Sequence, residues 1–270
     1  MDYGRTGGYG GGFVWPRLTP AVKTLMIVNF AVFFLNAVLR GQLAWLGISW
    51  DRMWEGYGLG LARLATSPFV HAYLSPWHLL MNMLMFYLFG TFVEEAIGRR
   101  RLYRLFVLSG VSGGILYSVL GLAMGNQVPA IGASGAVYGI MTYAACMAPR
   151  MKVLVIIFPI ELRWLVGTLV FVGVYMTYVN AVEGLSDGVA HGGHLGGAVW
   201  GFLAYRFPQQ GAAVTGRLRG WRQQRQSRAN QQRQEVLDEL LEKVHREGLG
   251  ALTEAERRFL DKASKQMRRK

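Results

Sequence analysis

The sequence has little cysteine and little charge. Cys146 is the only cysteine among 270 residues, so an intramolecular disulfide is excluded and the fold does not depend on an oxidising compartment. A cysteine–histidine cluster is also missing, so no metal site is expected. Charged residues make up 17% of the chain, against about 25% in an average protein, and 52% of residues are hydrophobic. This composition disfavours both an intrinsically disordered chain and a soluble globular enzyme.

The charge that is present is basic and is concentrated near the C-terminus. The formal net charge is +13, and residues 206–270 hold 16 Lys and Arg against 8 Asp and Glu. Nucleic-acid binders carry such charge on polar surfaces rather than on a chain this apolar, so no nucleic-acid partner is expected. Residues 1–12 contain six glycines and no apolar core of a signal peptide. We therefore expect residues 1–20 to be a flexible arm.

Six apolar segments have about the length that crosses a bilayer, which is roughly 20 residues. They predict an all-α fold, in which residues 21–207 form a six-helix bundle of a polytopic membrane protein. Residues 153–160 are apolar but too short to span, and we expect them to lie at the membrane interface. The predicted spans are 21–39, 76–95, 102–122, 132–148, 163–181 and 189–206.

The basic residues also predict the orientation of the spans. Arginines and lysines follow the second, fourth and sixth spans, whereas the connections after the third and fifth carry none. By the positive-inside rule, we expect both termini to be cytoplasmic. We expect the membrane itself to be a bacterial inner membrane. The long loop 40–75 then lies outside. Its three tryptophans favour a partly lipid-embedded loop over a simple tether: Trp45, Trp50 and Trp54.

The C-terminal extension changes in character after residue 207. Residues 208–234 are rich in Arg and Gln and are predicted to be a basic linker. Residues 235–270 have helical periodicity interrupted at Gly248, and Thr253 with Glu256 forms a capping-box pattern. This predicts a cytosolic helical hairpin. It is too short for a large core of its own, so we expect it to bind a partner or a second copy.

Three groups of polar residues occupy predicted spans, where polar groups are costly and usually functional. Ser134 lies in the Gly-Ala-Ser-Gly segment 132–135, which is equally typical of close helix packing. His191 and His194 lie in a glycine-rich span, and a neutral imidazole is the usual base for a serine. Gly197 and Gly201 share a side with His194 and would let its helix approach the serine helix. These spacings favour His194 over His191 as the base.

The other polar residues define the rest of the candidate site. Asp187 precedes His194 by seven residues, about 10 Å along a helix, and is better placed to pair with His191. A serine–histidine dyad is therefore favoured over a triad. His78 and Asn82 share one helix face and offer donors for a developing oxyanion. The alternative for each group is an interhelical hydrogen bond.

Taken together, these motifs resemble the rhomboid family of intramembrane serine proteases. The resemblance covers roughly residues 20–207 and rests on the segments 78–82, 132–135 and 194–197, with Tyr138 and Gly201. It implies cleavage of transmembrane protein substrates in or near their spans, often after small residues, without a cofactor. It implies that Ser134 is the nucleophile and His194 the general base.

The resemblance also implies supporting roles for four further residues. Tyr138 would pack against the His194 ring, Gly132 would leave backbone room beside the nucleophile, and His78 and Asn82 would join the Ser134 N–H in an oxyanion hole.

The chain departs from the family pattern in the outer loop, where a Trp-Arg pair is usual. Here the pair reads Ala62-Arg63, and the nearby Trp54 is a candidate to compensate. Two other functions fit a polytopic chain. One is a non-catalytic rhomboid-like binder that escorts transmembrane clients, although such proteins usually lack the serine or the histidine. The other is a transporter, but no inverted repeat or broken helix pair supports it.

Overall fold

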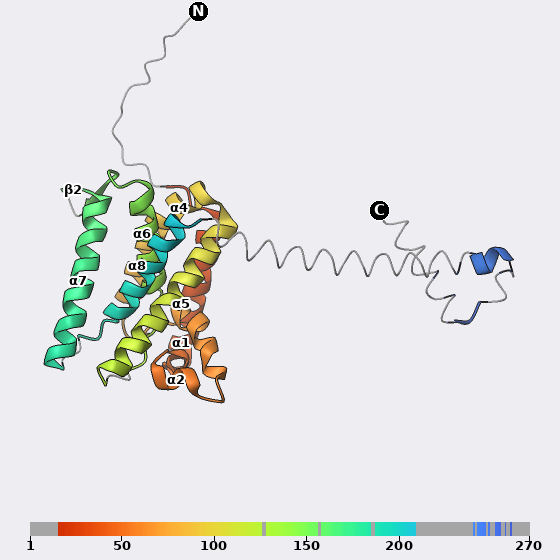
Figure 1. Cartoon of the computed structure of the whole chain (residues 1–270), viewed down its shortest axis with the longest axis horizontal. Helices are drawn as coiled ribbons and strands as arrows, with labels where there is room; N and C mark the ends of the chain where they lie inside the picture. Colours follow the sequence, from red (N-terminus) through yellow and green to blue (C-terminus); the bar gives the residue numbers. More distant parts are fainter. Residues whose placement is uncertain are drawn as a thin grey trace, which may run out of the picture. The chain divides into compact units, whose positions relative to one another are not determined.

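The computed structural model describes residues 16–125, 128–155, 158–184 and 187–208, together with 240, 242–246, 248, 252–254, 257 and 260. The chain divides into two units, residues 1–207 and 208–270. The first unit is built from long helices (Figure 1), which coincide with the six predicted spans to within three residues. They are α1 (Pro20–Val38), α4 (Pro76–Ile97), α5 (Arg99–Ala123), α6 (Ser134–Met147), α7 (Leu162–Glu183) and α8 (His191–Arg206).

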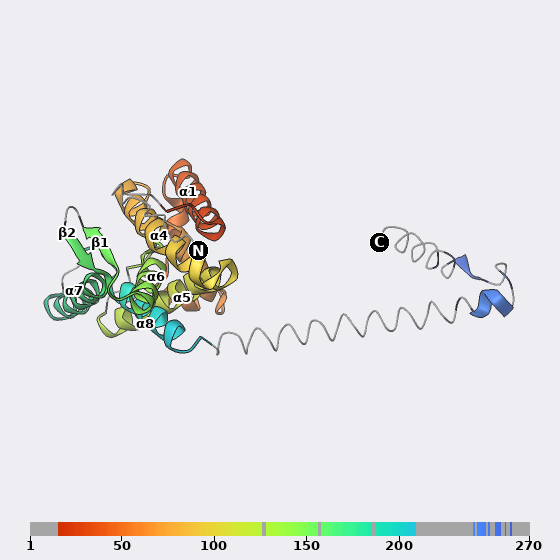
Figure 2. The same cartoon turned by 90° about the horizontal axis from the view of Figure 1, so that it is seen from above.

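The prediction of a mostly helical membrane protein is confirmed. Among the described residues, α1, α4, α5 and α7 are long and apolar enough to cross a membrane. Helices α6 and α8 are shorter, with 14 and 16 residues. These two short helices contact each other extensively, and α6 also packs against α4, α5 and α7. Figure 2 shows α6 inside the unit, with α1 and α7 on opposite sides of it.

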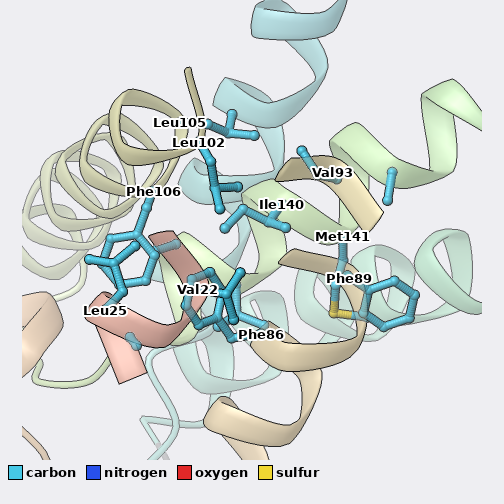
Figure 3. Close-up of a cluster of buried hydrophobic side chains, with 14 of the residues drawn as sticks. Val22, Leu25, Phe86, Phe89, Val93, Leu102, Leu105, Phe106, Ile140 and Met141 are labelled. Atoms are coloured by element: carbon cyan, nitrogen blue, oxygen red, sulfur yellow. The ribbon is translucent and has the colours of Figure 1, made fainter. Parts of the chain in front are cut away.

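The hydrophobic core lies between α1, α4, α5 and α6. Phe86 of α4 and Phe106 of α5 are fully buried, and their rings lie 5.2 Å apart. Val22 of α1 and Ile140 of α6 close the same cluster (Figure 3). Burying a side chain of this size stabilises the fold by about 1.5–3 kcal/mol. This packing holds the start of α6, and hence Ser134, against a rigid part of the molecule.

A carboxylate of α4 binds the N-terminus of α1. Glu94 accepts hydrogen bonds from the backbone N–H groups of Ala21 and Val22, each at 2.9–3.0 Å, and from the Thr19 hydroxyl at 2.5 Å. The first N–H groups of a helix have no partner within the helix, and they favour negative charge. Glu94 therefore serves as the N-terminal cap of a neighbouring helix.

The loop 39–75, called the outer loop after the side on which it is predicted to lie, is folded into short helical segments rather than extended chain. Arg63 forms an ion pair with Glu55 at 2.5 Å, donates to the Arg52 carbonyl at 2.7 Å and lies 5.5 Å from the Trp45 ring. Trp45 is thus the tryptophan that lies against Arg63, whereas Trp54, the candidate to compensate for the missing family tryptophan, packs edge-on against Trp50. The segments are η1 (Gln42–Leu46), α2 (Trp50–Trp54), η2 (Leu59–Ala62), α3 (Arg63–Thr66) and η3 (Ser67–Phe69).

The segment predicted to be interfacial forms a two-stranded antiparallel hairpin. Its strands are β1 (Lys152–Val155) and β2 (Phe158–Glu161), paired with Lys152 opposite Glu161. Pro159 lacks the N–H that a helix would need, and the aliphatic residues around it favour strand. Leu154 and Phe158 are exposed on this hairpin.

Helix α7 is the least buried of the long helices. Phe171, Val174 and Tyr178 are exposed along it, and only Leu162, Val166 and Gly173 are buried. Apolar side chains exposed along a whole helix are suited to contact with lipid.

The predicted arm 1–20, the linker 208–234 and the hairpin 235–270 lie largely outside the described residues. Within the second unit, residues 242–246 are helical, and Gly248 follows with a left-handed φ of 84°. The Arg257 N–H donates to the Thr253 carbonyl at 3.0 Å, as in a first helical turn. The proposed capping partner of Thr253, Glu256, is outside the described residues.

Candidate active site

Ser134 is the first residue of α6 and follows a tightly held loop. Gly132, two residues earlier, has a φ of 120°, which L side chains rarely adopt. A Cβ atom at Gly132 would also lie 2.8 Å from Cε1 of His78. Position 132 therefore requires glycine, both for its backbone conformation and for its contact with His78.

His194, on α8, lies directly opposite Ser134. Its Nε2 atom is 2.8 Å from the Ser134 Oγ atom, and its side chain is 8% exposed. A neutral imidazole accepts a hydrogen bond at one ring nitrogen, so Nε2 can accept the serine proton. The two residues are 60 positions apart in sequence, and the contact between α6 and α8 brings them together.

Glycines make that contact possible. A Cβ atom at Gly197 would collide with the Gly135 carbonyl oxygen, and one at Gly201 would collide with the Gly139 carbonyl oxygen. Close approach through small residues is typical of helices packed in membranes. The predicted role of Gly197 and Gly201 agrees with this packing.

Tyr138 and Asp187 take different positions around the histidines. The Tyr138 ring stacks on the His194 ring, with centroids 4.2 Å apart and planes 10° from parallel. Asp187 bonds His191 instead, with Oδ2 2.7 Å from Nε2. Among the residues that the structure describes, Nδ1 of His194 has no hydrogen-bond partner. The structure thus brings Ser134 and His194 together as a pair. Tyr138 stacks on the His194 ring, and Asp187 is not hydrogen-bonded to it.

His78 and Asn82 lie on the side of the site next to Gly132. His78 is half-buried on α4, and its Nε2 would lie 3.3 Å from a Cβ atom at Gly132. The Asn82 side chain is 7% exposed, and its Nδ2 donates to the His78 backbone carbonyl at 2.9 Å. One Nδ2 proton of Asn82 is thus committed within α4, and the second is available for another acceptor.

A cleft opens beside Ser134 toward the outer loop. It is open to solvent, its volume for water-sized groups is about 30 Å³, and small residues of α5 form one wall. Ser134 is among the residues that line it. Its lining includes Ile48, Pro68, Gly110, Gly113, Gly114, Tyr117 and Ile131.

His71 is a further residue of the site that the sequence did not indicate. It lies in the outer loop, is fully buried, and accepts a hydrogen bond at Nε2 from the Ala133 N–H at 3.3 Å. Its ring packs edge-on against His78, with centroids 5.4 Å apart. Burial, helped by His78, lowers the pKa of His71 to about 4 against the opposing effect of the Phe69 carbonyl. The one sequence signal was a histidine in an apolar, uncharged stretch.

The fold and the site together define a class of protein, namely a bundle of helices able to span a membrane with a serine–histidine pair between two of them. Such a pair has the chemistry of a hydroxyl nucleophile and a base, and the N–H groups in the first turn of a helix such as α6 are suited to negative charge. A family model described as the rhomboid domain matches residues 59–207, more than half of the chain. The chain belongs to the rhomboid family.

The relatives of this chain share moderate identity with it. It is 29% identical over 137 residues to Rhomboid protein 1, mitochondrial, of Saccharomyces cerevisiae, a match that covers 47% of this chain and 36% of the relative. It is 27% identical over 200 residues to RHOMBOID-like protein 12, mitochondrial, of Arabidopsis thaliana, covering 68% and 57%. It is 29% identical over 134 residues to Rhomboid protease GlpG of Haemophilus influenzae, covering 48% and 64%.

The similarity to rhomboid proteins covers only part of this chain and only part of its relatives. The chain spans between 36% and 64% of the length of these three relatives. Residues 223–266, in the second unit, match a family of unknown function, DUF6576. The rhomboid likeness therefore concerns the first unit, and the second unit has a separate family.

Proposed function

We propose that this chain is an intramembrane serine endopeptidase that hydrolyses peptide bonds in or near the transmembrane segments of membrane proteins. The observation that carries the proposal is the 2.8 Å distance between Ser134 Oγ and His194 Nε2 inside a helical membrane bundle. The rhomboid family model and the similarity to a protein named as a rhomboid protease support it.

In the proposed reaction Ser134 is the nucleophile and His194 the general base. The Ser134 oxygen attacks the scissile carbonyl carbon while its proton passes to His194 Nε2. His194 then donates this proton to the leaving amine nitrogen, and the acyl group remains esterified to Ser134. A water molecule that loses a proton to His194 attacks the ester, and the returned proton restores Ser134. No cofactor takes part in these steps.

The oxyanion formed during attack requires donors. We assign this role to the Ser134 N–H, which has no partner within the first turn of α6, and to the side chains of His78 and Asn82. Removing one such donor typically slows a reaction by about 10²–10³. Stacking on Tyr138 restricts the His194 ring to an orientation in which Nε2 faces Ser134.

The protein is an integral membrane protein, and we propose that it lies in a bacterial inner membrane with both termini in the cytoplasm. The cations after α4, α6 and α8 support this orientation. The cleft beside Ser134 would then open toward the outer side, where the loop 39–75 lies. A transmembrane substrate would need to unwind there to present an extended peptide bond.

Labelling with a fluorophosphonate probe tests the proposal. Purified wild-type protein is expected to react covalently with the probe and to cleave a single-span reporter. Ser134→Ala is expected to do neither, while its expression and thermal melting stay close to wild type, because the change removes only the hydroxyl oxygen and its hydrogen bond to His194.

Full cleavage by Ser134→Ala would overturn the assignment of the nucleophile. If the wild-type protein binds the reporter but neither cleaves it nor reacts with the probe, it is instead a non-catalytic binder that escorts transmembrane clients.

A further inference from the structure

The loop before Ser134 is tied to the outer loop at successive N–H groups. The Ala130 N–H donates to Ile48, which donates back, at 2.8 and 2.9 Å. The Gly132 N–H donates to the Ser67 carbonyl at 3.1 Å. The Ala133 N–H, the last before the nucleophile, donates to a side chain, Nε2 of His71. Of these three acceptors, Ile48 and Ser67 accept through backbone carbonyls, whereas His71 accepts through its side chain. A substitution can therefore remove the acceptor only at His71.

The two hydrogen bonds of Ala133 fix the direction of the next N–H group. Its own N–H is held by His71 at 3.3 Å, and its carbonyl accepts from the Val137 N–H at 2.9 Å. The Ala133 carbonyl and the Ser134 N–H belong to one planar peptide group. Once both peptide groups that flank Ala133 are held, the Ser134 N–H has a single direction.

His71 is itself held in place from two sides. Its backbone carbonyl accepts from Nδ2 of Asn36 on α1 at 3.0 Å, and Oδ1 of Asn36 accepts from the Leu43 N–H at 2.9 Å. Its ring lies against His78, which is beside the proposed oxyanion position. The backbone of His71 is thus fixed to α1, and its imidazole cannot turn away from Ala133 without disturbing its contact with His78 on α4.

We propose that His71 is a positioning residue for the peptidase reaction: by accepting the Ala133 N–H, it aims the Ser134 N–H at the oxyanion and sets the start of α6. This inference rests on the proposed function. His71 touches no reacting atom and acts through Ala133. The Nε2 atom must be unprotonated to accept, so the neutral ring with its proton on Nδ1 is the working form.

A matched pair of variants separates this role from mere filling of space. In His71→Gln, the side-chain amide oxygen reaches about as far as Nε2 of histidine and can still accept the Ala133 N–H. In His71→Asn, the same amide is one methylene shorter and falls short of it. Both variants carry the same chemical group, so they differ mainly in reach.

The experiment measures kcat and KM on a single-span reporter with the full-length protein, together with thermal melting. We expect His71→Gln to keep kcat within about threefold of wild type. We expect His71→Asn to lose roughly 10- to 100-fold in kcat with little change in KM, because misplaced catalytic groups lower the rate by such factors. Hydrogen exchange of the peptide that spans residues 130–136 should be faster in His71→Asn alone.

Equal kcat values for the two variants would overturn the proposal, as would loss of kcat in a well-folded His71→Gln. If His71→Asn does not fold, the kcat and amide protection of His71→Gln decide the matter. If the wild-type protein shows no cleavage and no labelling of Ser134, the proposed function fails. The positioning role is then judged by exchange alone, and equal protection in both variants overturns it.

Discussion

At the scale of single residues, two histidines one turn apart on α8 have different partners. His191, at the start of the helix, pairs with Asp187 in the preceding loop. His194 faces Ser134 and stacks on Tyr138. Their rings are only 5.9 Å apart, yet only His194 can exchange a proton with the hydroxyl of Ser134.

This difference predicts opposite outcomes for two alanine variants. His194→Ala should lose at least about 10³-fold in kcat, because it removes the base of the pair. His191→Ala should keep kcat within about threefold, since Asp187 and His191 form a pair outside the reacting atoms. Cleavage of a single-span reporter measures both. Activity in His194→Ala together with loss in His191→Ala would show that the base is the other histidine.

His71 gives the molecule a calculable dependence on pH. The pKa of His71 is lowered to about 4 by burial and by His78, whereas an unfolded histidine titrates near 6.5. Between these values the unfolded chain binds a proton that the folded protein does not, so stability falls as pH falls from about 6.5 to 4. A shift of this size corresponds to a loss of up to about 3 kcal/mol.

The measurement compares the melting temperature of wild type and His71→Gln across that range of pH. We expect the wild-type curve to fall more steeply, because glutamine does not titrate. Parallel curves would show that His71 does not contribute to the acid sensitivity of the fold.

The sequence indicated six residues of the candidate site but did not indicate His71. The six are Ser134, His194, Tyr138, Gly132, His78 and Asn82. Ser134, His194 and their neighbours are polar groups in apolar segments, and their spacing fits helix faces. His71 lies in an irregular loop, and its partner is a backbone N–H 62 residues away. A backbone donor has no signature in the sequence, so this contact required three-dimensional coordinates. Likewise, the stacking of Arg63 on Trp45 depends on a loop path that spacing alone does not define.

At the scale of elements, the contact between α6 and α8 sets the distance from serine to histidine. Gly201 lies two turns beyond His194 and has no space for a side chain, because the Gly139 carbonyl occupies it. Gly167 on α7 offers a control, since nothing lies within 4 Å of where its Cβ atom would be. The same substitution at these two positions therefore meets opposite surroundings.

Gly201→Ala is expected to push α8 away from α6. Overpacking of this kind costs about 1–3 kcal/mol, so both the melting temperature and kcat should fall, with kcat falling at least about tenfold. Gly167→Ala should leave kcat unchanged and should not lower the melting temperature, because alanine is the better helix former. The idea that glycine packing sets the site would be contradicted by wild-type kcat in Gly201→Ala.

The long helices could be predicted because an apolar run of about 20 residues has few other interpretations. The apolar segment 153–160, which lies in the hairpin of β1 and β2, was only recognised as too short to span, since brief apolar runs do not distinguish helix from strand. The short helices of the outer loop were missed for a related reason. Their stability comes from contacts such as the Arg63–Glu55 ion pair rather than from periodicity.

At the scale of the whole molecule, the chain joins two units that match different families. The rhomboid model ends at residue 207, and the family of unknown function begins at residue 223. Cations of the second unit outnumber its acidic residues, and such segments near a membrane are attracted to anionic lipid by about 1 kcal/mol per residue. We propose that the second unit binds a partner or a second copy and takes no part in catalysis.

Truncation after Pro208 tests this division. The shortened protein should keep the kcat and the melting temperature of the full chain, because all the contacts of Ser134 and His194 described above lie within residues 1–207. Its oligomeric state, or its recovery of partner proteins, should change. If both stay as in the full chain, residues 209–270 have no binding role of this kind; if kcat falls, the second unit takes part in the reaction.

Within the described part of the chain, no carboxylate is hydrogen-bonded to His194, and this has a consequence for how the protein enters the membrane. A resting pair of hydroxyl and neutral imidazole carries no net charge, so its helices can enter the bilayer without moving an ion out of water, a transfer that is very costly. In the proposed reaction, charge arises when a substrate carbonyl is attacked, as two opposite charges formed together, one on His194 and one on the substrate oxygen. The substrate oxygen is then the counter-ion of the protonated His194.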